Sequence, residues 1–594
     1  MKYATLLLMG TVLSLGACKA PSSSDIDSAS DAKTSAKLAD IKMVAPRMAV
    51  TPPAASAMVA AANPLAVKAG LEILEQGGSA VDAAVAVQTV LGLVEPQSSG
   101  IAGGAFLILY DNKSGDVWAY DGREMAPADI KANLFQDENG DPIKYFDGIA
   151  SGKSTGTPGA MAMLNRVHQD YGKLPWGPQM EPGIRIAEEG FAVTPRLFNA
   201  IDRMGKYALK NQKEPREYFF LEDGETPIPV GYVRDNPKYA DALRALQVNP
   251  RAMLEGPVAE AIITAIREEP RPGTLSLSDM AKYQPTKKPA LCSPYREYTV
   301  CGARPPSSGG VAVQSILGVL QNFDMAAMGP SLQGYHHFIE ASFLGYADRD
   351  KYVGDEAFVK VPLDSMLNQD YLKSRAGLIK KDRAMVDVKA GDHGIAGQDA
   401  TPDNPGTSHF TIVDKDGLTV SMTTTVESVF GSQRMAHGFI LNNQLTDFSF
   451  KSVDENGLPL ANAPAAGKRP RSSMSPAIVF DKNKQFLLTS GSPGGNSIIA
   501  YTTKTIVGIL DWGLTPQEAA SLPNVIARNG KVRLEENLMD GDIVDGLEAM
   551  GHNVIRSQGE RSGIQIIRKL PDGTLIGGAD PRSEGVALRP ADVK

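Results

Sequence analysis

Three absences narrow the function of this chain before any motif is considered. No run of Lys and Arg occurs, and the 60 basic and 68 acidic residues are mixed for a net charge of −8, which disfavours a nucleic-acid partner. Neither a His-Glu-x-x-His metal helix nor a Gly-x-x-x-x-Gly-Lys-Ser/Thr phosphate loop is found. Cysteine is scarce, with three residues in 594, and no histidine-rich segment accompanies it. We therefore predict neither a metal nor another cofactor.

Long apolar runs are also missing, and the one short run lies at the N-terminus. Residues 1–17 combine an early Lys, an apolar stretch too short to span a bilayer and small residues at the end, which predicts a signal peptide. Leu15-Gly16-Ala17-Cys18 resembles a bacterial lipobox with Cys18 as the lipidated N-terminus; an ordinary secreted protein with a Cys in its signal is the alternative. Lys19 favours the outer membrane. The sequence thus predicts periplasmic export in a Gram-negative-type bacterium, with membrane contact only through the lipid.

The segment that follows the leader has the composition of a linker. Residues 18–58 are rich in Ser, Ala, Asp, Lys and Pro and contain few bulky apolar side chains. Such a segment buries too little apolar surface to fold alone. We expect a disordered tether that holds the enzyme away from the lipid.

Two further cysteines lie close together in the middle of the chain. Cys292 and Cys301 flank a turn and a strand signal. In an exported protein this spacing favours a disulfide that closes a small loop. A metal site or a catalytic cysteine is the less favoured alternative.

Helix and strand signals are mixed along the rest of the chain. Asn63-Pro64 predicts a capped helix that stops at Gly77-Gly78, and Ser79 caps a second, mostly apolar helix to about Leu93. Strand pairs are expected at 104–120 and 407–426, with mainly helices between 160 and 380. Antiparallel hairpins among helices indicate a layered α/β fold.

A threonine far from either terminus is the most informative residue. Thr407–Val413 and Leu418–Val426 are typical of strands, and Asp414–Gly417 between them is a turn signal. A three-residue loop places Thr425 opposite Thr407, whereas a two-residue loop places Thr424 there. Either register sets a second hydroxyl beside the first. On the local pattern alone, an ordinary Thr-rich hairpin is the favoured interpretation, because Thr is common in strands.

A series of short blocks extends the pattern over nearly the whole chain, from about Asn63 to about Gly585. The blocks are Asp121–Pro127, Ala150–Gly152, Gly156–Gly159, Arg304–Gly310, Tyr346–Arg349, Thr407–His409, Phe430–Ser432, Leu441–Gln444, Asp447-Phe448, Lys468–Pro476 and Gly491–Gly495. In this order they resemble the γ-glutamyltranspeptidases (glutathione hydrolases), N-terminal nucleophile hydrolases that mature by autoproteolysis. The resemblance implies an αββα four-layer sandwich. It also implies a cut between Gly406 and Thr407 that yields a heterodimer of a large subunit, 59–406, and a small subunit, 407–594.

In the family that the chain resembles, the cut frees the α-amine that serves as the catalytic base. A threonine hydroxyl needs a base, and the α-amine freed at Thr407 can supply it, with a reference pKa of about 7.7–8.0. Thr425 is the expected hydroxyl partner, and the backbone N–H groups of Gly494 and Gly495 are expected to stabilise the oxyanion. His409 lies on the same strand face as Thr407 and receives no role.

The resemblance also implies a pocket for a glutamyl head group. Arg123 is the expected partner of the α-carboxylate, with Ser472 and Ser473 beside it. Gln444 and Asp447 are the expected partners of the α-ammonium.

Two positions depart from the family pattern. Glu427 stands where many members carry Asn, and it adds a negative charge near the expected ammonium. Thr446 replaces an acid that is common beside Asp447. The polar segment 448–471, between these positions and Ser472, is either a lid over the site or a plain surface loop.

The sequence as a whole predicts an exported γ-glutamyl transferase and glutathione hydrolase. Thr407 would form a γ-glutamyl ester with a donor such as glutathione, and the acyl group would pass to water or to the amine of an amino acid or peptide. A glutaryl-cephalosporin acylase is the related alternative, although its substrates lack the ammonium that Gln444 and Asp447 would bind. An uncleaved lipoprotein scaffold is a third possibility, which the retention of Thr407, Thr425, Arg123 and Gly494-Gly495 disfavours.

Overall fold

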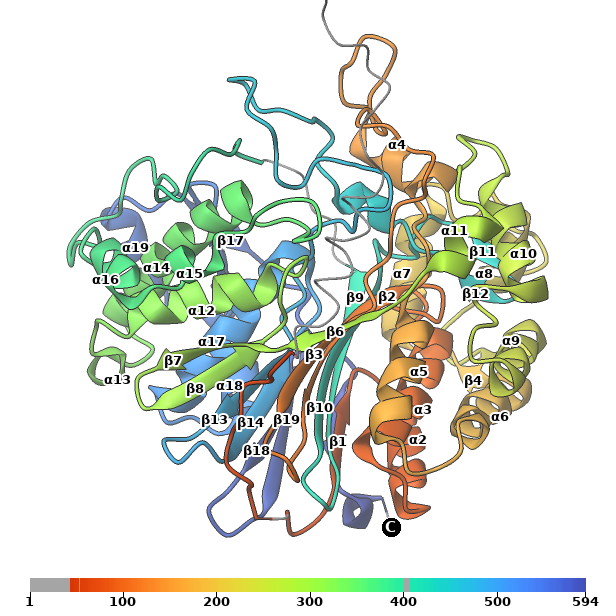
Figure 1. Cartoon of the computed structure of the whole chain (residues 1–594), viewed down its shortest axis with the longest axis horizontal. Coiled ribbons are helices and arrows are strands. Elements are labelled where there is room, and N and C mark those ends of the chain that lie inside the picture. The colour runs from red at the N-terminus through yellow and green to blue at the C-terminus, as the bar shows by residue number, and fades with distance from the viewer. Residues whose placement is uncertain (1–42, 53, 400–405, 594) are drawn as a thin grey trace, which may run out of the picture. The chain divides into compact units, whose positions relative to one another are not determined.

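Two antiparallel sheets stacked face to face form the centre of the unit Ala45–Lys594 (Figure 1). The computed structural model describes residues 43–52, 54–399 and 406–593. The seven-stranded sheet has the order β20-β1-β9-β10-β2-β3-β6, and the six-stranded sheet has the order β19-β18-β14-β13-β8-β7. The first comprises β1 (Met58–Ala61), β2 (Gly104–Tyr110), β3 (Val117–Asp121), β6 (Thr286–Pro289), β9 (Gly406–Val413), β10 (Thr419–Glu427) and β20 (Val586–Leu588). The second comprises β7 (Leu291–Tyr295), β8 (Tyr298–Gly302), β13 (Ala477–Phe480), β14 (Phe486–Gly491), β18 (Gln565–Lys569) and β19 (Leu575–Ala579).

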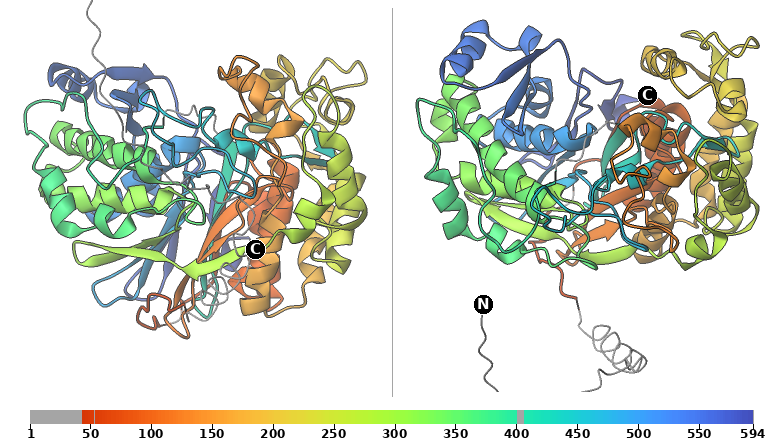
Figure 2. Two further views of the ribbon diagram at one scale, coloured as in Figure 1. Left: turned by 45° about the horizontal axis from the view of Figure 1, so that its top comes forward. Right: turned by 90° about the horizontal axis from the view of Figure 1, so that it is seen from above.

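Helices cover the outer face of each sheet, so the expected αββα sandwich is confirmed (Figure 1, Figure 2). On the seven-stranded sheet lie α2 (Pro64–Glu75), α3 (Ala80–Val94), α5 (Ala160–Tyr171), α6 (Glu181–Glu189), α7 (Pro195–Gly205), α8 (Lys213–Phe219), α9 (Pro237–Val248), α10 (Gly256–Ile266) and α11 (Leu277–Lys282). On the six-stranded sheet lie α12 (Gly309–Leu320), α13 (Met325–Met328), α14 (Leu332–Tyr352), α16 (Gln369–Ala376), α17 (Ile498–Leu510), α18 (Pro516–Ser521) and α19 (Gly541–Ala549).

Smaller elements complete the fold around this sandwich. A three-stranded sheet joins β15 (Val525–Arg528), β16 (Lys531–Glu535) and β17 (Val554–Ser557), and two short pairs join β4 (Phe191–Ala192) to β5 (Val233–Arg234) and β11 (Met435–Ala436) to β12 (Phe439–Ile440). The short helices α4 (Tyr145–Ile149) and α15 (Leu363–Met366) lie in the remaining connections.

Successive side chains of each strand pack into different layers of the core, because they alternate between the two faces of the sheet. In β2, Leu107 and Leu109 pack with the helices of the first outer layer, while Phe106 and Ile108 pack between the two sheets. Successive strand side chains point to opposite faces, so a central strand with both faces covered is apolar throughout. All seven residues of β2 are buried.

Capping residues fix the first two helices, as the sequence predicts. The Asn63 side chain accepts a hydrogen bond from the backbone N–H of Leu65 at 2.9 Å. Ser79 and Asp82 form a reciprocal capping box at the start of α3. Every residue of α3 is buried, which agrees with its apolar composition.

The expected disulfide is present in the structure, whereas part of the predicted tether is folded. Cys292 and Cys301 face each other across β7 and β8 and are joined by a disulfide, as expected. Residues 45–52 and 54–58, assigned to the tether, instead lie on the sandwich: the backbone N–H of Met48 donates to Gly115 at 2.7 Å, and that of Thr51 donates to Asn112 at 2.7 Å. Cys18 and the leader lie outside the described residues. In the described ranges, no helix has both the length and the apolar character to cross a bilayer.

Candidate active site

The register of the central hairpin sets the position of Thr407. Strands β9 and β10 pair with Thr407 opposite Thr425, so the three-residue loop is the one that forms. A bulge between Thr425 and Glu427 then places Glu427 opposite Gly406. The extra residue re-aims the strand at this point, as bulges beside functional sites commonly do.

A chain of hydroxyl hydrogen bonds joins the two threonines to the bond before Thr407. Thr407 Oγ1 donates to Thr425 Oγ1 at 3.2 Å, and Thr425 Oγ1 donates to the carbonyl oxygen of Gly406 at 2.6 Å. The backbone N–H of Glu427 donates to Thr425 Oγ1 at 2.8 Å, which fixes that hydroxyl. Thr425 therefore accepts from the candidate nucleophile and polarises the adjacent carbonyl at the same time.

The position of Gly406 admits no side chain. A Cβ built there would lie 2.5 Å from the backbone carbon of Ser428 and 2.6 Å from the carbonyl oxygen of Glu427. Neither backbone atom can move far without breaking the end of β10. Glycine is thus required for the close approach of the two strands at the bond before Thr407.

A glycine turn after β14 presents backbone donors beside Thr407. Gly494 has φ +134° and Gly495 has φ +57°, conformations that a side chain would strain. Among the described residues, neither backbone N–H donates a hydrogen bond. Gly494 and Thr407 line one pocket, and Gly495 and Thr407 line another, so the glycine turn and Thr407 border the same spaces.

The predicted head-group residues all line one pocket with Thr407 and Thr425. They are Arg123, Glu427, Gln444, Asp447, Ser472 and Ser473. These six residues come from four separate stretches of the chain, and the pocket exists only because these stretches meet beside β9 and β10. Gly406 and Gly494, the remaining predicted residues of the centre, line a second pocket together with Thr407.

Arg123 is the fixed cation of this pocket. Its guanidinium is bonded to the Asp447 carboxylate, and it donates to the carbonyl oxygens of Pro470 at 3.0 Å and Arg471 at 2.8 Å. The side chain is 1% exposed. Glu124 lies 3.9 Å from the same guanidinium, and burial raises the pKa of that carboxyl to about 8. A neutral Glu124 leaves the positive charge of Arg123 balanced mainly by Asp447.

Asp447 is the link between the two expected halves of the pocket. Gln444 Nε2 donates to Asp447 Oδ2 at 2.7 Å, and Arg123 is bonded to the same oxygen. The carboxylate is therefore positioned by its neighbours. Its side chain is 22% exposed, so it still faces the pocket.

The two departures from the family pattern are in contact. The buried carboxylate of Glu427 accepts hydrogen bonds from Ser428, Asn443 and, at 3.4 Å, the Thr446 hydroxyl. An acid at position 446 would place a second negative charge against Glu427, whereas a hydroxyl donates to it. In this protein the carboxylate at this end of the pocket is therefore that of Glu427 on β10, and the Thr446 hydroxyl donates a hydrogen bond to it.

Arg349 also lines this pocket, although the sequence predicted no role for it. Its guanidinium donates to Asn496 Oδ1 at 2.8 Å and to Ser308 Oγ at 2.9 Å, and it is bonded to Ser473. Burial, together with the nearby Arg471, lowers the pKa of Arg349 to about 10. Its signal was present in the block Tyr346–Arg349, but only the fold shows that α14 directs this side chain to Ser473. Asn496 directly follows the glycine turn and was missed for the same reason.

His409 has the wrong environment for a base. It is fully buried, its Nδ1 lies 2.9 Å from Thr423 Oγ1, and burial lowers its pKa to about 3. The ring is neutral and packs between the sheets. Leaving it without a role agrees with this placement.

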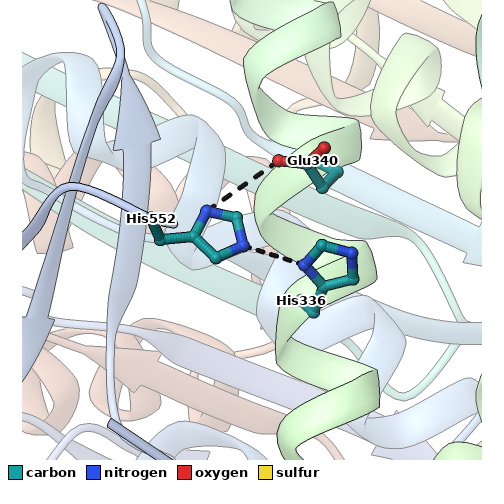
Figure 3. Close-up of side chains that lie close together, drawn as sticks. All are labelled: His336, Glu340 and His552. Carbon is teal, nitrogen blue, oxygen red and sulfur yellow. Dashed lines mark hydrogen bonds and ion pairs between the residues drawn. The ribbon is translucent and has the colours of Figure 1, made fainter. Parts of the chain in front are cut away.

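One cluster in the described part of the chain has the residue types of a metal site, and it lies outside the Thr407 pocket. His336 and Glu340, one turn apart on α14, meet His552 (Figure 3). His336 Nδ1 is 2.8 Å from His552 Nε2, and His552 Nδ1 is 3.9 Å from Glu340. Each of the three side chains offers one potential ligand atom, and these atoms lie within 4.8 Å of one another. Zinc in proteins typically has three or four protein ligands.

The segment 448–471 forms one wall near the pocket. Phe450 stacks on Phe135 at 4.6 Å, and Asn462 Nδ2 donates to the Asp447 carbonyl oxygen at 2.6 Å. Lys468 Nζ donates to the carbonyl oxygens of Ala461 and Ala463 at 2.8 and 2.9 Å. The segment is folded against its surroundings and anchored directly to a pocket residue.

Comparisons with known proteins agree with this site. A family model described as gamma-glutamyltranspeptidase matches residues 66–589. A glutathione hydrolase proenzyme of Escherichia coli (strain K12) is 35% identical over 536 residues, covering 89% of this chain and 90% of that protein. An acylase ACY 1 proenzyme of Pseudomonas sp. (strain SE83) is 32% identical over 543 residues, covering 89% of this chain and 93% of that protein.

A solved structure extends the likeness to three dimensions. The cephalosporin acylase from Bacillus halodurans matches with a TM-score of 0.78 at 27% identity, covering 91% of this chain and 97% of that chain. The family model spans nearly the whole sandwich, including both sheets and the hairpin of Thr407. The chain therefore belongs to the γ-glutamyltranspeptidase family.

Proposed function

We propose that this protein is a self-processing γ-glutamyl transferase and glutathione hydrolase with Thr407 as its nucleophile. The observation that carries the proposal is the hydroxyl chain from Thr407 through Thr425 to the Gly406 carbonyl oxygen. It joins a nucleophile, a polarising donor and a scissile bond in one hairpin. The named relatives, a glutathione hydrolase proenzyme and an acylase proenzyme, supply the reaction classes to be compared.

The first reaction is the cut that creates the catalyst. Thr407 Oγ1 attacks the Gly406 carbonyl carbon, while the Thr425 hydroxyl stabilises the oxygen of that carbonyl. The C–N bond breaks, the hydroxyl proton ends on the new α-amine, and an ester joins Gly406 to Thr407. Water then hydrolyses the ester, leaving Gly406 with a carboxylate and Thr407 with a free amine. The products are the large subunit, which ends at residue 406, and the small subunit, which begins at 407.

The second reaction is acyl transfer. The α-amine takes the proton of Thr407 Oγ1 as the hydroxyl attacks the γ-carbonyl of the donor. The backbone N–H groups of Gly494 and Gly495 stabilise the oxyanion. Collapse of the tetrahedral intermediate releases the amine with a proton and leaves a γ-glutamyl ester. Water or the amine of an amino acid or peptide then displaces Thr407.

Charge in the pocket favours a glutamyl donor. Arg123 supplies the cation for an α-carboxylate, and Ser472 and Ser473 line the same pocket. Asp447 and Glu427 supply two carboxylates for an α-ammonium. A glutaryl group has the carboxylate but no ammonium, so it would leave these acids without a partner. An acylase is the second candidate because acylases are among the relatives.

We also propose export to the periplasm and lipidation at Cys18. The leader composition and the lipobox-like Leu15–Cys18 support this localisation. Replacing Cys18 with Ala should move the protein from the membrane fraction to the soluble periplasmic fraction. Labelling with a clickable palmitate analogue should mark the wild type and spare the variant. An unlabelled wild type found in the soluble fraction would reject the anchor.

Self-cleavage should depend on the two hydroxyls in different ways. Thr407→Ala should remain a single chain, since the nucleophile is gone. Thr425→Val keeps the shape but removes the donor to Gly406, and it should slow cleavage on the order of 100-fold. Thr425→Ser is the matched control that retains the hydroxyl. A time course on a denaturing gel, with N-terminal sequencing of the smaller band, measures each rate; a wild type that stays uncut contradicts the mechanism.

The preference for γ-glutamyl over glutaryl substrates should depend on recognition of the substrate's α-ammonium group. The processed wild type should turn over γ-glutamyl-p-nitroanilide faster than glutaryl-p-nitroanilide, and Asp447→Asn should narrow that preference by about tenfold. The ratio of the two kcat/KM values is the readout, which cancels differences in the amount of active enzyme. Faster wild-type turnover of the glutaryl compound would favour the acylase instead.

The carboxylate on β10 should be exchangeable with one at position 446. Glu427→Asn removes a charge to which four side chains, including Tyr145, donate hydrogen bonds, and it should raise KM for γ-glutamyl-p-nitroanilide by roughly tenfold. Adding Thr446→Asp should recover most of the loss, because it returns a carboxylate to the same contact. KM and the ratio of transfer to hydrolysis with glycylglycine are measured together. If Glu427→Asn changes neither quantity, the carboxylate has no part in specificity.

A further inference from the structure

The cluster of His336, Glu340 and His552 is separate from the site at Thr407, because none of the three residues lines either pocket there. All three are buried. His336 and Glu340 share one face of α14, and His552 lies in the loop between α19 and β17 (Figure 3). His336 and His552 are 216 residues apart, so the sequence shows no metal motif at this place.

Glu340 is a buried carboxyl group to which no Lys or Arg is paired within the described ranges. Its Oε2 accepts the backbone N–H of Met385 at 2.9 Å. Its Oε1 has no hydrogen-bond partner and faces His552 Nδ1 at 3.9 Å, which is too long for a hydrogen bond. Because buried carboxylates are normally paired with a charge or bound to a metal ion, this oxygen calls for a positive ion.

The two histidines cannot satisfy each other and Glu340 at the same time. His336 Nε2 lies 2.6 Å from the carbonyl oxygen of Lys380, so Nε2 carries the proton and Nδ1 has a lone pair, which lies 2.8 Å from His552 Nε2. With its proton on Nδ1, His552 sets two lone pairs against each other. With the proton on Nε2, its Nδ1 lone pair faces the Glu340 carboxylate. A metal ion removes the conflict, whereas a proton on Glu340 would require a hydrogen bond that the 3.9 Å separation does not allow.

The surroundings hold two of these side chains as the outer partners of a metal site do. A ligating histidine donates its other ring N–H to a carbonyl or carboxylate oxygen, and a ligating carboxylate accepts a further hydrogen bond. Lys380 makes the first contact, with His336, and Met385 makes the second, with Glu340. Both partners lie in the segment that follows α16, so one stretch of backbone orients both side chains.

The spacing and the access of the cluster suit a small ion. One potential ligand atom from each residue lies within 4.8 Å of the other two. Zinc ligands at bond lengths of about 2.0–2.2 Å lie on the order of 3.3 Å apart, so rotation of the side chains would close the set. His552 also lines a cavity of about 490 Å³ with Met385 and Asn553, which gives the ion an entry path and a source of water as a fourth ligand.

We propose that His336, Glu340 and His552 bind a divalent transition-metal ion, with Zn²⁺ as the ion that best fits two imidazoles and one carboxylate. The ion has a structural role, since its ligands line neither pocket at Thr407. It fastens α14 to the loop before β17. One consequence rests on the proposed function: α14 belongs to the large subunit and His552 to the small one, so the ion would also link the two pieces of the cut chain.

The zinc content of the full chain tests the site. Wild-type protein that is stripped with a chelator and dialysed against Zn²⁺ should retain about one zinc ion per molecule, measured by inductively coupled plasma mass spectrometry. Glu340→Gln and His552→Gln should each retain less than about a tenth of that amount, because each lacks one of three ligands. His337→Gln is the matched control on the same helix. His337 Nδ1 lies 2.8 Å from the Gln333 carbonyl oxygen, and this variant should bind zinc as the wild type does.

Thermal melting gives a second readout that shows whether each variant is folded. Zn²⁺ should raise the Tm of the stripped wild type and of His337→Gln, because a ligand that binds the native state stabilises it. The Tm of Glu340→Gln and of His552→Gln should not respond. In the cut protein, chelation should also lower the urea concentration at which the two pieces separate.

Two results would overturn the assignment. Equal zinc in the wild type and in Glu340→Gln/His552→Gln places the ion elsewhere on the protein. A stripped wild type that takes up no zinc and whose Tm does not respond leaves only protons or water between these side chains. Neither measurement needs turnover or the cut at Gly406, so an inactive, uncut chain that binds zinc would reject the proposed function and leave the metal site standing.

Discussion

The pairing of Thr407 with Thr425 is the constraint on which the rest of the site depends. It is set by the loop between β9 and β10, since a shift of one residue would turn each side chain to the other face of the sheet. The bulge after Thr425 then brings Glu427 opposite Gly406 and supplies the backbone N–H that fixes the Thr425 hydroxyl. The geometry of the proposed catalytic pair is therefore set by strand register.

Two pockets meet at Thr407. In the first, Arg123 and Asp447 form an ion pair, and the proposed zwitterionic head group would exchange its own charges with that pair. The second is lined by Gly406, Gly494 and residues of α7, and it contains both basic and acidic side chains.

Several features of this arrangement could be predicted from the sequence because they depend on local chemistry. Asn63 and Ser79 cap their helices because capping is local chemistry. The hairpin was predictable, but its register was open between Thr425 and Thr424, since the turn signal suited two loop lengths. Arg349 was overlooked because its role depends on α14 meeting the Ser473 loop, a contact 124 residues away in sequence. The predicted tether extends too far because residues 45–52 and 54–58 pack against the sandwich, in part through backbone hydrogen bonds, which composition does not reveal.

The strand order has a consequence for the cut chain. In the larger sheet, β1 of the N-terminal piece lies between β20 and β9 of the C-terminal piece, and β10 lies against β2. The smaller sheet joins β13 of one piece to β8 of the other. Dissociation of the two pieces would therefore separate paired strands in both sheets, so the cut that we propose would change the covalent connectivity of the protein and leave its cohesion intact. The new chain end at Thr407 would stay paired with Thr425 on β10, and it would lack the freedom that ends usually have. Its amine would be held in place as soon as it forms.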